Sequence, residues 1–257
     1  MPHPVKGGPR GMPARQTRVK RWSFHVSGGP SCLDFANTVS WRRSSQPIER
    51  LNRYGDLVEW ARQSRVLTPA EGRALDGEAR QRPIAAARML TRTRALRETI
   101  YRIFSGIAAR IPPNDENLAH LDRELHEALR NLHLTRTRSG AILAWSRGRG
   151  QLARPLWNAA RSAAEVLISD NVRRLKTCPA SNCGWVFLDT SKNGTRRWCD
   201  MQVCGSRAKA RSYYARKSGQ RRQARRAPGP LGSASSTDPA SGPTKSPPPA
   251  SRADAAR

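Results

Sequence analysis

The chain has 257 residues, enough for one large or two modest domains. It carries 47 Lys and Arg against 19 Asp and Glu, and the formal net charge of +28 predicts a polyanionic partner. No apolar run approaches the roughly 18 residues of a membrane span, and the mean hydropathy is −0.71, which excludes a transmembrane protein.

Both ends of the chain have the composition of disordered segments. Residues 1–21 contain six basic residues and no acid among several Pro and Gly, so we expect a disordered basic arm. A transit peptide is the alternative there, although the segment lacks an amphipathic stripe. Residues 219–257 are basic at first and then, from Ala227, rich in Pro, Ser and Ala, which predicts a disordered tail.

Between these ends, residues 22–172 have the patterns of a mainly helical α+β domain with a small β-sheet. Alternating aromatic and polar residues over 22–26 predict a short strand, and a helix is expected to begin at Cys32. Asp56 precedes apolar residues at helical spacing and is expected to cap that helix. The run Thr68-Pro69-Ala70-Glu71 has the form of a capping box at the start of another helix.

The second half of this domain is expected to contain longer helices and a hairpin. Apolar residues keep helical spacing over 84–111, until Pro112 and Pro113 stop the helix, and Asn114 or Asp115 caps the next one. The alternating runs 132–137 and 141–145 predict a β-hairpin. Helical spacing returns over 152–175 and leads directly to a group of cysteines.

Four of the five cysteines follow the pattern C-x4-C-x15-C-x4-C. Four thiolates at about 2.3 Å close a tetrahedron around Zn²⁺, so the pattern predicts one structural zinc ion with no open coordination position. An iron–sulfur cluster, or cysteines without a metal, are the alternatives. The Asn-Gly pair at 193–194 predicts a hairpin from 185–188 back to 196–198. The predicted zinc ligands are Cys178, Cys183, Cys199 and Cys204.

Cysteine usage also indicates the compartment. Crowded cysteines in a chain without a secretory signal fit a metal site in a reducing cytosol better than a disulfide framework, so we expect a cytoplasmic protein. Cys32 has no partner at ligand spacing and is expected to be a buried apolar residue.

The excess of positive charge is concentrated after the N-terminal domain. Residues 173–226 contain 15 basic residues and two acids. A helix is expected after Cys204, with Ser206 as its N-cap, and its like charges four residues apart repel one another by about 0.2–0.5 kcal/mol a pair. An anionic partner would relieve this repulsion, whereas a merely solvated basic face is the alternative. The candidate nucleic-acid contacts are Arg196, Arg197, Arg207, Lys209, Arg211, Tyr213, Tyr214, Arg216 and Lys217.

Two segments resemble known families. The paired cysteines, with RRWC at 196–199 and CG-x-R-x-K-x-R at 204–211, closely resemble the CGNR zinc finger, except that Ser206 stands where the family has Asn. Upstream, Gly28-Gly29, Leu33-Asp34-Phe35-x-Asn37-Thr38 and Leu57-x2-Trp60 resemble the α+β domain called ABATE. The resemblance implies an ABATE-like domain over 22–172, a zinc-ribbon-like finger with its basic helix over 173–218, and a transcriptional regulator.

Other polar and aromatic residues have ordinary explanations. Asp34, Asn37 and Thr38, near His25, are expected to cap a helix, with a small-ligand pocket as the alternative. No nucleophile elbow, phosphate-binding loop or paired-carboxylate spacing is present, so we expect no enzyme activity. Three histidines lack metal-ligand spacing and five tryptophans are expected in the core; they are His120, His126 and His133, and Trp22, Trp41, Trp60, Trp145 and Trp157.

These patterns together predict a DNA-binding transcriptional regulator whose N-terminal domain senses a small-molecule effector or forms a homodimer. RNA binding is the alternative within the same class. A zinc-stabilised scaffold for protein interactions, without nucleic-acid binding, is the alternative from a different class.

Overall fold

The computed structural model describes residues 23–26, 29–146 and 151–226, with no side-chain description for 219–226. Within it, the chain up to Ala210 forms one compact unit and the chain from Arg211 onward forms a second. The predicted disordered segments 1–21 and 227–257 lie outside the described residues. Residues 219–226, predicted as the start of the tail, instead continue a helix to Arg226.

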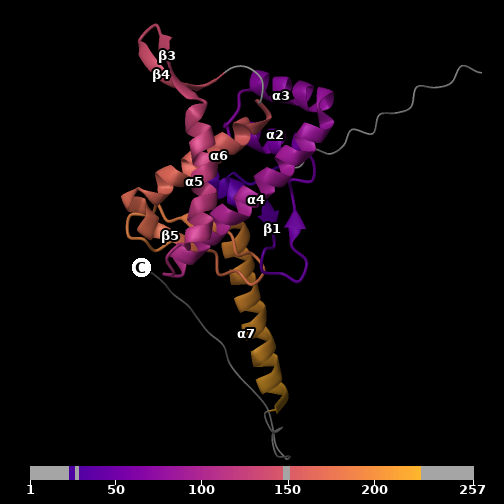
Figure 1. Ribbon diagram of the computed structural model, residues 1–257. Coiled ribbons are helices and arrows are strands. Elements are labelled where there is room, and N and C mark those ends of the chain that lie inside the picture. Colours follow the sequence, from indigo (N-terminus) through magenta and orange to yellow (C-terminus); the bar gives the residue numbers. More distant parts are fainter. Residues whose placement is uncertain (1–22, 27–28, 147–150, 227–257) are drawn as a thin grey trace, which may run out of the picture. The chain divides into compact units, whose positions relative to one another are not determined.

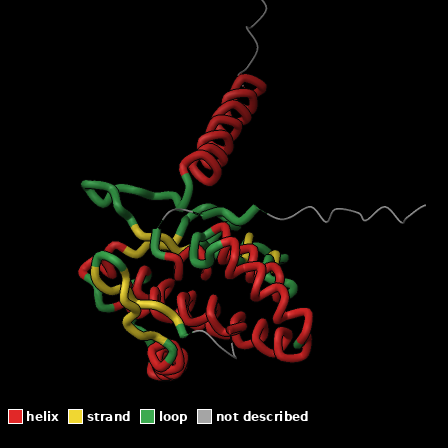
Figure 2. Tube along the Cα trace, turned by 90° about the horizontal axis from the view of Figure 1, so that it is seen from above, coloured by secondary structure: helices red, strands yellow, loops and turns green. Residues whose placement is uncertain are grey.

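The described residues are mainly helical with small antiparallel sheets, which confirms the predicted fold class (Figures 1 and 2). The helices are α1 (Ser31–Ala36), α2 (Tyr54–Gln63), α3 (Pro69–Gln81), α4 (Pro83–Ala108), α5 (Asp115–Arg130), α6 (Arg154–Leu167) and α7 (Ser206–Arg226). In these residues three two-stranded sheets pair β1 (Val39–Ser40) with β2 (Ile48–Glu49), β3 (Leu132–Thr137) with β4 (Gly140–Trp145), and β5 (Leu175–Thr177) with β6 (Val186–Leu188).

Helix α4 is the centre of the core. Its apolar side chains at helical spacing, Leu96, Ile100, Ile103 and Phe104, are at most 1% exposed. Helices α5 and α6 run beside it, and α1, α2 and α3 also pack on it (Figure 1). The amphipathic periodicity read from residues 84–111 therefore corresponds to the helix against which the others are assembled.

Most of the predicted helix starts are confirmed. Thr68 Oγ1 accepts from the N–H of Glu71 at 3.3 Å, and Glu71 Oε2 accepts from the N–H of Thr68 at 2.8 Å, which completes the capping box of α3. Asn114 caps α5. Asp56 caps α2 from inside its first turn rather than from the position before it, because α2 begins at Tyr54 and the Asp56 carboxylate accepts the N–H groups of Asn52 and Arg53, which precede the helix.

Three other local predictions are wrong. Residues 23–26 form no strand; Phe24 joins the core and its N–H donates to Gln63. Residues 185–188 do not pair with 196–198, because β6 pairs with β5. Helix α6 ends at Leu167 and Leu175 begins β5, so the helical spacing over 152–175 covers an α-helix, 3-10 turns on both sides of it and the start of a strand.

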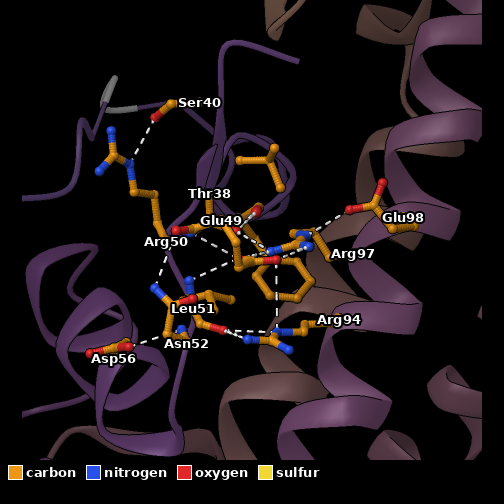
Figure 3. A network of polar contacts seen from close by, with 12 residues as sticks. Thr38, Ser40, Glu49, Arg50, Leu51, Asn52, Asp56, Arg94, Arg97 and Glu98 are labelled. Atoms are coloured by element: carbon orange, nitrogen blue, oxygen red, sulfur yellow. Dashed lines mark hydrogen bonds and ion pairs between the residues drawn. The ribbon is translucent and has the colours of Figure 1, made fainter. Parts of the chain in front are cut away.

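A network of ion pairs fixes β2 to α4 (Figure 3). The Arg97 side chain is only 4% exposed, and it donates to both carboxylate oxygens of Glu49 at 2.6 and 2.7 Å and to Glu98 at 2.9 Å. Thr38 Oγ1, next to β1, accepts a further bond from Arg97. Such bidentate pairs are among the stronger hydrogen bonds in proteins, so the β1–β2 hairpin is held firmly on α4.

Glu49 should make stability depend on pH. Burial opposes ionisation of Glu49, but the hydrogen bonds and charge of Arg97 outweigh it and lower the pKa of Glu49 below its usual value. A lowered pKa stabilises the fold above about pH 4.5, and this contribution is lost as the pH falls further. Glu49→Gln should cost about 1–3 kcal/mol at pH 7. In urea unfolding, its difference from the wild type should shrink below pH 4; a difference independent of pH would contradict this assignment.

Candidate metal centre and nucleic-acid interface

The four predicted ligands, Cys178, Cys183, Cys199 and Cys204, form a compact group of buried thiols. Their sulfur atoms all lie within 4.8 Å of one another, with 3.6 Å between Cys183 and Cys199 and 3.7 Å between Cys199 and Cys204. A zinc tetrahedron with bonds of about 2.3 Å has edges of about 3.8 Å, so the arrangement fits one zinc ion. All four cysteines are free of disulfides.

Two backbone turns bring the pairs of cysteines together. In the first turn, the N–H of Cys178 donates to Trp185 O at 2.8 Å and the N–H of Cys183 donates to Ala180 O at 2.9 Å. The second turn is a π-helical segment, Met201–Gly205, in which Asp200 accepts from the N–H of Val203 at 2.7 Å. This second turn runs directly into α7, so the metal site and the basic helix share one continuous stretch of backbone.

The four thiols interact strongly with one another. Contacts with Cys183 and Cys199 hold the pKa of Cys178 far below its usual value, whereas contact with Cys178 and burial raise the pKa of Cys183, Cys199 and Cys204. Thiolate is the form of cysteine that binds a metal, so zinc binding here would release protons from the other three thiols. Cys32 differs: it is fully buried, and burial raises its pKa to about 12, which confirms an inert core residue.

Buried polar contacts shape the loop that joins the two cysteine pairs. Asp189 is fully buried, and it accepts from Lys176 Nζ at 2.6 Å and from the N–H of Ser191 at 2.9 Å. Burial opposes its ionisation, but these hydrogen bonds and the Lys176 charge outweigh that effect and hold the pKa of Asp189 below its usual range. Lys176 also donates to the carbonyls of Gly194 and Arg196, so residues 194–196 are tied to β5 rather than paired with β6.

Gly205 and Ser206 have roles in the transition from the metal site to α7. A Cβ at Gly205 would lie 2.5 Å from Met201 Sδ and 3.3 Å from Trp198 Cδ1, so a larger residue there would have to displace the Met201 side chain. Ser206 is not an N-cap: its backbone is already helical, and its hydroxyl donates to Met201 O. Asp200 fills the capping role that was predicted for Ser206.

Asn37 joins the finger to the N-terminal domain. Its side-chain Nδ2 donates to Val186 O at 2.8 Å, and its Oδ1 accepts from the N–H of Val186 at 3.0 Å. Nearby, Trp185 Nε1 donates to Val39 O at 2.8 Å, and Tyr101 donates to Gly184 O at 2.9 Å. The amide that was expected to cap a helix or line a ligand pocket therefore docks the strand β6.

The predicted nucleic-acid contacts separate into an inward residue and exposed ones. Arg196 points inward, where its guanidinium donates to Trp198 O and Cys199 O and lies over the Phe187 ring. Its side chain therefore stabilises the loop that carries Cys199. Arg197 is exposed beside the Trp198 ring. The exposed residues on α7 are Arg207, Lys209, Arg211, Tyr213, Tyr214, Arg216 and Lys217.

The exposed side chains of α7 are distributed around the helix. At 100° per residue, Arg207, Arg211 and Tyr214 share one face, and Lys209 and Arg216 lie on the other, which Tyr213 flanks. The rings of Tyr213 and Tyr214, which are 54% and 67% exposed, meet edge to face at 5.5 Å. Cations and aromatic groups are therefore available around most of the helix.

The histidines form no metal site in the part of the chain that the structure describes, where the only group with metal-ligand geometry is the four cysteines. His120, His126 and His133 each contact a different neighbour, namely Thr99, Asp122 and Ser146. Sequence reasoning missed a role for His25, whose Nε2 lies 3.2 Å from Asp200 Oδ2 and whose ring packs on Trp185.

None of the described helices is long and apolar enough to cross a membrane.

An α+β domain joined to a closed four-cysteine site defines a zinc-finger protein with one structural zinc ion. Residues 29–170 match the ABATE family model, described as "Putative stress-induced transcription regulator", and residues 174–217 match the CGNR zinc finger. The first match covers more than half of the chain, so the protein belongs to the ABATE family. No curated protein matches it. The predicted domain limits at 22–172 and 173–218 stay predictions.

We predict that the protein binds one zinc ion per chain and that this binding requires all four cysteines. Cys199→Ala should lose the zinc and unfold the finger, because apparent binding energies of such sites are on the order of 10 kcal/mol. Elemental analysis and a chelator-release assay measure the stoichiometry. Cys32→Ala is the matched control, since it removes a buried thiol outside the site and should retain the zinc. Iron in the purified protein, or full zinc occupancy in Cys199→Ala, would contradict this assignment.

The contact between Asn37 and Val186 predicts that loss of the Asn37 side-chain amide strongly lowers the stability of the fold. Asn37→Ala should lower the free energy of unfolding by about 2–4 kcal/mol, because both backbone groups of Val186 lose their partner while buried. Asn52→Ala is the control, since this exposed amide makes only a surface hydrogen bond and should cost less than about 1 kcal/mol. Equal effects of the two substitutions in urea unfolding would refute the docking role.

Proposed function

We propose that the protein is a DNA-binding transcription regulator in which the zinc finger presents α7 to the duplex. The observation that supports it is the composition and exposure of this helix. Nine of its 21 residues are Lys or Arg and none is acidic. From Ser206 to Ser218 every side chain is exposed except that of Ala208, which is half-buried.

The energetics of α7 favour a polyanionic partner. A helix without an apolar face gains little from packing, and its repeated positive charges repel one another. Binding to phosphates removes that repulsion and releases counterions from the nucleic acid. The DNA major groove is about 12 Å wide and admits one α-helix, and Arg and Lys can donate to guanine edges there.

The zinc site contributes rigidity rather than chemistry in this proposal. Four sulfur ligands leave the metal no open position for a substrate, so we propose no catalytic role for the protein. The π-helical turn that carries Cys204 continues into α7 and fixes the first turn of the helix. A helix that is ordered before binding loses less entropy when it meets the duplex.

In this proposal the protein is cytoplasmic. Its N-terminal domain regulates DNA binding. A cleft between α2, α3 and α4, lined by charged residues that include Arg53, Asp76 and Arg80, is the proposed place for a small-molecule effector. The β3–β4 hairpin exposes Leu134, Ile142 and Leu143 by half or more of their surface, which favours a homodimer.

Salt dependence tests the proposed function. If about five phosphates are neutralised, the logarithm of the affinity for a labelled DNA duplex should fall with log salt at a slope of −4 to −5. Lys209→Ala should make the slope shallower by about one, equally for all sequences. Arg123→Ala, on the exposed side of α5, is the matched control and should leave the slope unchanged.

Two other outcomes would contradict DNA as the partner. A preference for single-stranded RNA that is lost in Tyr213→Ala and Tyr214→Ala would favour RNA binding, because exposed aromatic rings stack on unpaired bases. Absence of binding to either nucleic acid at physiological salt would favour the protein-interaction scaffold.

A further inference from the structure

A loop of the N-terminal domain lies directly on the zinc finger. Residues 41–47 connect β1 to β2, and both stems are fixed, since Arg50 Nε donates to Ser40 Oγ at 3.0 Å and Glu49 is paired with Arg97 (Figure 3). At the loop, the N–H of Arg42 donates to Cys183 O at 3.1 Å. The loop is therefore held against the first cysteine pair by its backbone.

Trp41 has a backbone conformation that a tryptophan seldom adopts. Its φ is +57°, in the left-handed region where a bulky side chain is strained and glycine is favoured. Trp41 also departs from the predicted core role: Trp60 and Trp157 are at most 4% exposed, whereas Trp41 is half-buried. A strained and partly exposed indole indicates that the side chain is needed at this place for something other than filling the core.

The neighbour of the Trp41 indole is a basic residue of the finger. The guanidinium of Arg207 lies over the ring, 4.8 Å from its centroid, which is a cation–π geometry. Arg207 is exposed and forms no hydrogen bond or ion pair with any residue that the structure describes. Trp41 thus restrains the orientation of a guanidinium whose donors are still available to an anionic ligand.

The two arginines that follow Trp41 have different environments. Arg42 is neutralised by Glu98 at 2.8 Å, and its side chain is 8% exposed. Arg43 is exposed, and its side chain packs on Gly184, where a Cβ would lie 2.9 Å from Arg43 Cγ. Its guanidinium makes one long hydrogen bond, at 3.5 Å, to Cys178 O. Arg43 therefore keeps its positive charge at the surface, beside the metal centre.

We propose that the 41–47 loop is part of the nucleic-acid surface, with Arg43 contacting phosphate and Trp41 positioning Arg207 for its contact. The proposal rests on the proposed function and extends the interface from the finger to the N-terminal domain. The loop contains two arginines and no acid, so its charge complements a phosphate backbone. Trp41 is a positioning residue that acts through Arg207.

The test uses zinc-loaded, full-length protein and a fluorescein-labelled DNA duplex of 20 base pairs of mixed sequence, measured by anisotropy over a range of salt. Arg43→Ala should make the salt slope shallower by about one. Trp41→Gly should weaken binding by about twofold to fivefold, the range of a surface cation–π contact. Because glycine adopts the left-handed backbone readily, this variant should keep its zinc content and melting temperature, which separates a binding role from a folding role.

Two further variants test whether Trp41 affects DNA binding through Arg207. In the Arg207→Ala background, Trp41→Gly should cause no additional loss, since the residue that it positions is gone. Trp41→Phe should recover part of the affinity, because it restores an aromatic ring under the guanidinium. Arg123→Ala again serves as the charge control.

The outcomes distinguish this inference from the proposed function. If Arg43→Ala and Trp41→Gly bind as the wild type does while Lys209→Ala is weakened, the loop is not part of the interface and the proposed function stands. Additive losses from Trp41→Gly and Arg207→Ala would overturn the positioning role. If the wild-type protein does not bind the duplex, both the proposed function and this inference are wrong.

Discussion

The finger depends on one amide as well as on its metal. Asn37 satisfies both backbone groups of Val186, and with that contact the Val186 side chain enters the same core as α4. The finger has a small apolar cluster of its own around the four cysteines, and the N-terminal domain adds the core that receives Val186. The metal fixes the loops around the four cysteines, and the domain core fixes β6, so the base of α7 is held from two sides.

Arginine, the main source of the positive charge, serves two purposes in this chain. Arg42, Arg97 and Arg196 are turned inward, where carboxylates or backbone carbonyls accept their hydrogen bonds. Arg43 and Arg207 lie at the surface near the metal site. The net charge of +28 therefore overstates what is available to a ligand. The exposed cations closest to the metal site are Arg43 and Arg207, and further ones follow along α7.

Local signals in the sequence predicted local features well. The capping box at Thr68, the periodicity of α4, the β3–β4 hairpin and the four-cysteine group each depend on residues close together or on a distinctive spacing. The missed features depend on distant partners. Neither the pairing of Asn37 with Val186 nor the inward turn of Arg196 leaves a periodic pattern. The Asn193-Gly194 pair predicted a hairpin, but the hydrogen bonds of Lys176 and Asp189 direct the chain elsewhere.

The contact between Asn37 and Val186 also limits when this part of the chain can complete its fold. These residues are 149 positions apart, so during synthesis α1 must wait for most of the protein before its docking strand is available. Until then the apolar surface that receives Val186 is uncovered, and the strand is kept in place partly by a site that needs zinc. Zinc supply is thereby linked to how long an incompletely folded chain is exposed to proteases, and so to the amount of protein that accumulates.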